Sequence, residues 1–222
     1  MAADDVLLDA AASGGAALRF YQWAAPTLSL GYFQPHTAAR SFPQLIWLRR
    51  ATGGEAIVHD HELTYSLALP AGSEFQPRLV AWMIRMHELI RDALGRLSVV
   101  AELCERERRL ADVLCFLHHT PGDLIVAGHK VAGSAQRKQR GALLQHGSIL
   151  MGRSDHAPSL PGIAELTGRV VSAEDLREAL VEGFRKETGW TLEEGPFDER
   201  ERASIGDRIA SRYATSLWNE KR

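Results

Sequence analysis

Short runs in which apolar and polar residues alternate fill much of the chain up to residue 150. Such runs, bounded by glycine and proline, predict β-strands that bury one face. Gly53-Gly54 separates two of the runs, and Pro70 ends another. The predicted strands are residues 18–23, 28–32, 45–48, 56–59, 64–69, 97–103, 113–117, 124–127, 131–135 and 143–150.

Apolar residues at helical spacing alternate with polar ones in four other places. The clearest is 77–95, where one apolar face includes Trp82, Met86 and Ile90 and predicts a helix packed on the core. The other predicted helices are 4–12, 173–187 and 199–213. The order of helix, strands, helix, strands and helices favours an α+β fold with a mixed, largely antiparallel sheet flanked by helices over a doubly wound fold.

Composition limits the possible classes of function. The 222 residues, 45% of them hydrophobic, suit a single domain over 1–222 that needs no disulfide or metal to fold. A formal net charge of −2 argues against a general nucleic-acid binder. Two cysteines without a framework spacing favour a reduced, cytoplasmic setting. The N-terminus lacks a signal-peptide pattern and no apolar stretch approaches the roughly 20 residues that cross a bilayer, so no membrane partner is expected.

The segment 49–60 is the first candidate for chemistry. Gly53 and Gly54 let the backbone turn tightly and approach a ligand, and Arg49 and Arg50 precede them. Two arginines at such a turn are suited to a carboxylate, a phosphate or an acidic partner. The alternative interpretation is a hairpin turn with exposed arginines.

Lys130 and Cys115 are the other candidates. Lys130 is followed by small residues that permit a substrate to come close, and a partly buried lysine can stabilise negative charge on a carbonyl oxygen. It could equally be a surface lysine beside a glycine turn. Cys115 lies in an apolar run, where a reactive thiol needs a cationic neighbour. Lys130 is that neighbour if the two predicted strands pair; otherwise Cys115 is a buried structural residue.

Two histidines at alternate positions, His59 and His61, would point to one face of a strand. No other part of the sequence supplies a convincing set of completing ligands, so no metal site is expected.

Together these segments resemble the lipoate–protein ligase, octanoyltransferase and biotin–protein ligase superfamily over about residues 4–219. Within it, the Lys130 segment and the glutamine-histidine-glycine-serine run at 145–148 are most similar to the cysteine-dependent octanoyltransferases, which carry a cysteine-phenylalanine pair where this chain has Cys115-Phe116. The resemblance implies that Cys115 accepts the acyl group and that Lys130 contacts its carbonyl. It also implies an acyl-binding set: Arg49, Arg50, Thr52, Gly53, Gly54, His59, Gly133, Ser134 and Ala135.

The same resemblance implies an acyl carrier protein as donor, a lipoyl carrier domain as acceptor and no cofactor. Two departures bear on this. Glu55 stands where these families usually have glycine or arginine, and an acidic residue would repel a phosphate. The chain also lacks room for the accessory domain of many lipoate ligases. Both favour the transferase over the alternative, a lipoate ligase that uses ATP and Mg²⁺ to form lipoyl-AMP. A third alternative is a non-catalytic protein that binds acyl groups or carriers.

Overall fold

An antiparallel six-stranded sheet forms the centre of the fold in the computed structural model, which describes residues 1–72, 74–76, 81–110 and 113–222. Its order is β1-β5-β9-β8-β7-β6, and each neighbouring pair is antiparallel. This confirms the predicted α+β class. The strands are β1 (Ala17–Tyr21), β5 (Glu62–Leu69), β6 (Glu102–Leu103), β7 (Leu124–Val126), β8 (His129–Gln139) and β9 (Ala142–Leu150).

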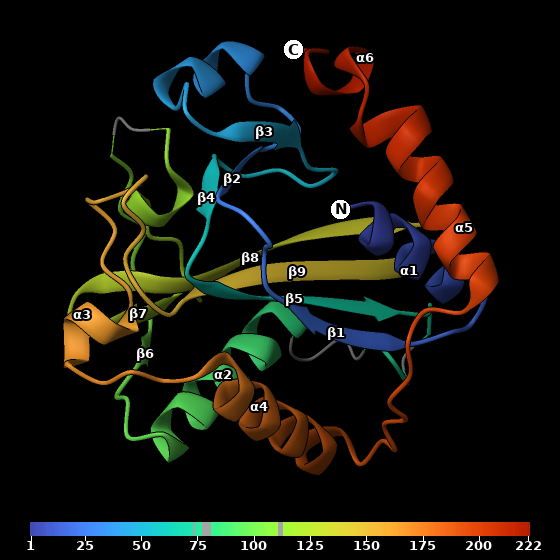
Figure 1. The fold of residues 1–222 in the computed structure, drawn as a ribbon. Coiled ribbons are helices and arrows are strands. Elements are labelled where there is room, and N and C mark those ends of the chain that lie inside the picture. Colours follow the sequence, from blue (N-terminus) through green and yellow to red (C-terminus); the bar gives the residue numbers. More distant parts are fainter. Residues whose placement is uncertain (73, 77–80, 111–112) are drawn as a thin grey trace.

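Two long helices cover one face of this sheet. They are α2 (Trp82–Arg96) and α4 (Ala173–Thr188), and both lie below the sheet in Figure 1. Met86 and Ile90 of α2 and Phe184 of α4 are buried in one core cluster with the sheet, and the Trp82 and Phe184 rings stack. The predicted apolar face is therefore confirmed, although residues 77–80 of the predicted helix lie outside the described residues.

The opposite face carries the two chain ends. Helix α1 (Ala2–Ala12) packs on β5 and β9, and α5 (Glu199–Arg208) packs on α1, as Figure 1 shows. A π-turn (Ile209–Tyr213) and α6 (Ser216–Asn219) follow α5, so the helix predicted over 199–213 ends earlier as an α-helix. Within the described ranges, no helix has the length and apolar character needed to cross a membrane. The sequence pattern did not predict three short elements: a 3₁₀ turn (His36–Ser41), α3 (Ile163–Thr167) and α6.

A second, three-stranded sheet has the order β3-β2-β4, with β2 (Thr27–Leu30) parallel to β3 (Ile46–Arg49) and antiparallel to β4 (Ile57–His59). In Figure 1 it lies on the side of the large sheet away from α2 and α4. All three were predicted as strands. The hairpin interpretation is wrong, because β2 separates β3 from β4 and both arginines are buried.

Two predicted strands are wrong. Residues 97–101 are not a strand: the Leu97 and Val99 amides close the end of α2 on the Ala93 and Leu94 carbonyls, so only β6 remains of the predicted 97–103. The 113–117 run is a 3₁₀ turn, Cys115–Leu117, preceded by a single bridge between Leu114 and Ala56. Cys115 therefore does not reach Lys130 through strand pairing.

Candidate active site

A cleft lies where the small sheet, the Gly53-Gly54 turn, the Cys115 turn and strands β8 and β9 meet. Apolar groups supply much of its wall, including Ile57 and Phe116. A mostly apolar cleft with a few polar groups is typical of a small-ligand site. The predicted site residues that line it are Arg50, Gly53, Gly54, His59, Cys115, Gly133, Ser134 and Ala135.

Cys115 lines this cleft and contacts Lys130, which is not among the described residues that line it. The Lys130 Nζ is 3.9 Å from the half-buried Cys115 Sγ, and it also donates to the His118 carbonyl oxygen at 3.2 Å. The Lys130 side chain is buried and pairs with the Asp123 carboxylate at 2.8 Å. A partly exposed thiol beside a cation is the arrangement found at nucleophilic cysteines. The predicted contact between the Cys115 thiol and the Lys130 ammonium is thus present, but a turn brings the two groups together and not a pair of strands.

The backbone after the glycine turn holds Cys115 in place. The Cys115 amide donates to the Ala56 carbonyl oxygen at 2.8 Å, and the Ala56 amide donates to the Val113 carbonyl oxygen at 2.9 Å. On either side of the cysteine, Leu114 and Phe116 are buried. The glycine turn and the thiol are consequently parts of one rigid arrangement.

Close backbone packing explains why residues 31 and 54 are both glycine. Gly54 has a φ of 90°, a left-handed conformation that favours glycine. A Cβ on Gly31 would lie 1.7 Å from the Gly54 carbonyl oxygen, so the chain can pass here only without a side chain. The result is a turn that is pressed against the loop following β2.

Both predicted anion-binding arginines are used inside the protein. Arg50 donates to the carbonyl oxygens of Ser29 at 3.0 Å, Gly53 at 2.8 Å and Glu55 at 2.6 Å. Burial lowers the pKa of Arg50, while nearby Cys115 and Glu55 oppose that shift. Arg50 therefore shapes the turn and places a second cation near the thiol.

Arg49 lies one residue further from the cleft and is fully buried. Its Nη1 donates to the carbonyl oxygens of Gly31 at 2.8 Å and Gln34 at 2.6 Å, and its Nε donates to that of Asn219 at 2.9 Å. Arg49 joins the C-terminal α6 to the loop that surrounds the glycine turn. It is not among the described residues that line the cleft.

Glu55, the residue that departs from the family pattern, has a defined partner. Its Oε2 accepts a hydrogen bond from the Gln34 Nε2 at 2.5 Å, and the Gln34 Oε1 accepts one from the Gly31 amide at 3.0 Å. A carboxylate is therefore held beside the glycine turn, where it would oppose a bound phosphate.

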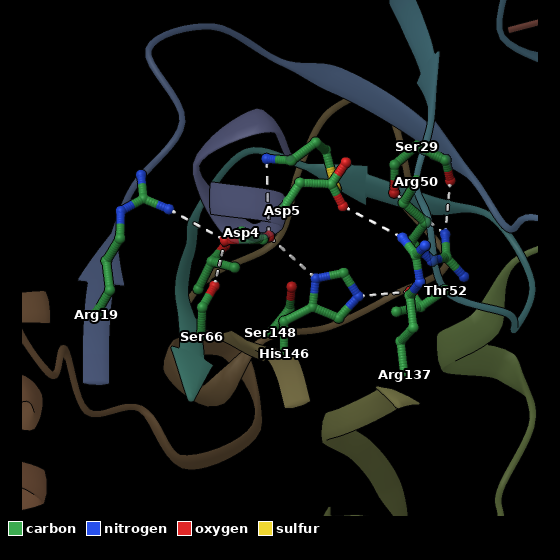
Figure 2. A network of polar contacts seen from close by, with 12 residues as sticks. Asp4, Asp5, Arg19, Ser29, Arg50, Thr52, Ser66, Arg137, His146 and Ser148 are labelled. Carbon is green, nitrogen blue, oxygen red and sulfur yellow. Dashed lines mark hydrogen bonds and ion pairs between the residues drawn. The ribbon is translucent and has the colours of Figure 1, made fainter. Parts of the chain in front are cut away.

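Thr52 begins a buried polar chain that the sequence did not predict (Figure 2). Its hydroxyl lies 2.6 Å from the His146 Nε2, and the His146 Nδ1 lies 3.3 Å from an oxygen of Asp4, whose other oxygen accepts from Ser66 at 2.6 Å. Burial lowers the pKa of His146 although Asp4 opposes the shift, so the imidazole is neutral near pH 7. The neutral ring then donates its Nδ1–H to the Asp4 carboxylate, and its Nε2 accepts a hydrogen bond from the Thr52 hydroxyl. This chain ties the glycine turn to β9 and α1.

His146 lies in the glutamine-histidine-glycine-serine run at 145–148, which contributes to the family resemblance. It lines the cleft together with Gly147 and Ser148. Asp123 and Asp4 carried no recognisable spacing, so only the tertiary structure identifies them.

His59 has partners on both ring nitrogens. Its Nδ1 lies 2.6 Å from the Glu62 carboxylate, its Nε2 lies 2.7 Å from the Ser29 hydroxyl, and its ring stacks on Trp23. In contrast, the His61 side chain is 63% exposed. Within the described ranges, no group of three or more histidine, cysteine, aspartate or glutamate residues is placed to hold a metal ion.

The protein is expected to lose stability as the pH falls towards 5. Burial lowers the pKa of His87, which lies under the Asp123 loop and donates to the Gly122 carbonyl oxygen at 2.5 Å. Because the unfolded chain takes up the proton first, near its ordinary value of about 6.5, acid favours unfolding. Denaturant unfolding at about pH 7.5 and about pH 5 checks this.

The His87→Leu variant should show a smaller difference between the two pH values, because it removes one such group. His61→Leu is the control and should leave the difference unchanged, since that side chain is exposed. An equal pH dependence in His87→Leu and the unmodified protein would contradict the assignment.

Comparison with known proteins shows which family this chain resembles. Residues 1–158 match the family model of the lipoyl protein ligase A/B catalytic domain. An octanoyltransferase LipM from Geobacillus kaustophilus is 33% identical over 259 residues, covering 100% of this chain and 93% of the relative. A second octanoyltransferase LipM, from Kyrpidia tusciae, is 33% identical over 264 residues, covering 100% of this chain and 94% of the relative.

Solved structures share the fold at lower identity. A lipoate-protein ligase A bound with ATP has a TM-score of 0.77 and 22% identity, covering 99% of this chain and 92% of that one. A bi-partite lipoate protein ligase from Thermoplasma acidophilum, solved in work that includes its E2 lipoyl domain, has a TM-score of 0.76 and 21% identity, covering 99% and 89%.

Proposed function

The chain belongs to the lipoyl protein ligase A/B catalytic-domain family, and from this membership we propose that it transfers an octanoyl group to a lysine of a lipoyl carrier domain through a Cys115 thioester. Relatives named octanoyltransferase, which are covered over 93% and 94% of their length, support an acyltransferase enzyme. The observation that carries the thioester step is the 3.9 Å contact between the Lys130 ammonium and the sulfur of Cys115, a residue that lines the cleft.

In the first step, the Cys115 thiolate attacks the carbonyl carbon of an octanoyl thioester carried by an acyl carrier protein. The new Sγ–C bond forms and the bond from that carbon to the donor sulfur breaks. The donor leaves as a thiolate, which takes up from solvent the proton that Cys115 released when its thiolate formed. The negative charge that develops on the carbonyl oxygen is stabilised by Lys130, with Arg50 as a second nearby cation.

In the second step, the neutral amine of the acceptor lysine attacks the same carbonyl carbon. The C–N bond forms, the Sγ–C bond breaks, and the amine's proton returns to the Cys115 sulfur. The products are an octanoyl amide on the lipoyl domain and a regenerated enzyme. The cleft residues Gly133, Ser134 and Ala135 would line the bound acyl chain without occupying its space.

The competing function is a lipoate ligase that activates its substrate with ATP, as the structure of a relative bound with ATP makes conceivable. The turn in this chain is a poor fit for phosphate groups. Arg50 donates to the Gly53 and Glu55 carbonyl oxygens, and Gln34 holds the Glu55 carboxylate at the same turn. These contacts support a reaction that needs no ATP and no Mg²⁺, so the mechanism contains no adenylate.

A transfer assay separates these functions. The purified protein is given octanoyl-acyl carrier protein and an apo lipoyl domain without ATP, and in parallel octanoate or lipoate with ATP and Mg²⁺. We expect the lipoyl domain to gain an octanoyl mass in the first mixture. Modification in the second mixture alone would establish the ligase. Tight octanoyl binding with no modification in either mixture would establish the non-catalytic alternative.

A further inference from the structure

Lys130 has a second buried partner besides the thiol. The Asp123 carboxylate lies 2.8 Å from the Lys130 Nζ, with side chains that are 8% and 4% exposed. Asp123 lies just before β7 and is itself fixed: its Oδ2 accepts from the Thr120 amide at 2.7 Å, and its carbonyl oxygen accepts from the Cys104 amide at 2.7 Å. The carboxylate is therefore held in place before any substrate binds.

The remaining titratable groups around Lys130 are histidines. His87 of α2 and His119 of the loop before β7 both interact electrostatically with Lys130, and burial lowers the pKa of each. His118 contributes its carbonyl oxygen to the ammonium at 3.2 Å. Across the described residues, the Asp123 carboxylate is the one anionic side chain that pairs with the Lys130 ammonium at salt-bridge distance.

Because both side chains are buried, it is costly to neutralise one partner of the Asp123–Lys130 pair and leave the other charged. If the ammonium gave up its proton, an aspartate that is nearly excluded from water would be left without a counter-charge. A buried pair of opposite charges at hydrogen-bond distance instead favours the charged form of both partners. A lysine in this position is suited to act as a fixed positive charge and is unsuited to take up a proton during turnover.

We infer that Asp123 is a positioning residue that keeps Lys130 as an ammonium throughout the reaction, so that Lys130 stabilises charge and does not serve as the base. This inference rests on the proposed cysteine-dependent transfer. The protons still balance without Lys130, because the donor sulfur takes up from solvent the proton that Cys115 releases, and the acceptor amine's proton returns to the cysteine sulfur.

The test is the pH dependence of Cys115 octanoylation in a single turnover, measured by intact mass from about pH 6 to about pH 10. The unmodified protein should reach a plateau and keep it at high pH. In Asp123→Asn the shape and hydrogen-bonding capacity are nearly kept but the charge is lost. The unpaired buried ammonium then loses its proton within this range, and the rate falls at least about tenfold from its maximum.

Two further variants establish the cause. Asp123→Asn combined with Lys130→Arg should regain the high-pH plateau, because a guanidinium stays charged at every pH used. Asp5→Asn is the matched control: Asp5 is also a buried aspartate paired with cations, Arg137 and Arg212, but it contacts neither Lys130 nor Cys115 in the described structure. Its profile should keep the unmodified shape.

A high-pH plateau in Asp123→Asn would overturn the inference, as would a falling limb that persists in the double variant. Neither result can be confused with failure of the proposed function. In that case the unmodified protein would gain no octanoyl group at any pH.

Discussion

Replacing Cys115 by alanine is expected to lower octanoyl transfer to a lipoyl domain by at least about 1,000-fold, because the variant has no atom that can carry the acyl group. The variant should fold normally. The side chain is only half-buried, and the backbone hydrogen bonds that hold this turn to Ala56 do not involve the sulfur. The rate of transfer under single-turnover conditions and a thermal unfolding curve check both parts of the expectation.

Cys104 supplies the matched control, since it is the other cysteine of the chain. Its sulfur donates to the Arg106 carbonyl oxygen at 3.0 Å, and it does not line the cleft within the described part of the chain. Cys104→Ala should therefore transfer octanoyl groups at the unmodified rate. A Cys115→Ala protein that retains more than about a tenth of the transfer rate would show that the thiol is structural.

The second large effect is expected for Gly133→Ala. A Cβ at this position would lie 2.6 Å from the Lys130 Cε and 2.9 Å from its Nζ, both closer than unbonded atoms approach. The end of a flexible side chain can move aside, so the loss of stability should be small. The same movement takes the ammonium away from Cys115, and displacement of a catalytic group by about 1 Å can cost about 100-fold in rate.

Gly95→Ala is the control for this substitution. Gly95 lies in α2 with nothing within 4 Å of its Cβ position, so alanine there should leave the rate unchanged and raise helix stability by about 0.5–1 kcal/mol. We expect Gly133→Ala to separate activity from stability in transfer assays and melting curves. A Gly133→Ala protein with full activity would mean that the position of Lys130 does not limit the reaction.

Local pattern correctly predicts a helix with one buried apolar face, such as α2, and long strands that are buried throughout, such as β5 and β9. The helical spacing of Trp82, Met86 and Ile90 corresponds to the buried face of α2. Strands β5, β8 and β9 were all located, although β8 extends to Gln139 beyond its predicted end. Its later residues are partly exposed and polar, so they carry little apolar signal.

The two wrong strands show where local pattern fails. An apolar run surrounds Cys115, but its burial comes from Leu114 and Phe116 packing in the second core cluster around a 3₁₀ turn. The same apolar composition fits a buried strand or a buried turn. Only the long-range bridge to Ala56 decides between them.

Eight of the eleven predicted site residues line the cleft, but their geometry was not predictable from the sequence. Family resemblance identified Cys115 and Lys130, while their 3.9 Å contact depends on how two distant segments pack. Asp123 was not predicted, because a single aspartate beside a glycine turn resembles many surface residues. The burial of Arg49 and Arg50 was also unexpected, since arginine is mostly exposed in folded proteins.

The most direct test of cysteine-dependent transfer is the intact mass of the protein after brief incubation with octanoyl-acyl carrier protein and no acceptor. We predict a gain of one octanoyl group, located on the peptide that contains Cys115, absent from Cys115→Ala and lost again when an apo lipoyl domain is added. Octanoylation of the lipoyl domain at an undiminished rate by Cys115→Ala, or by a protein that never gains that mass, would contradict it.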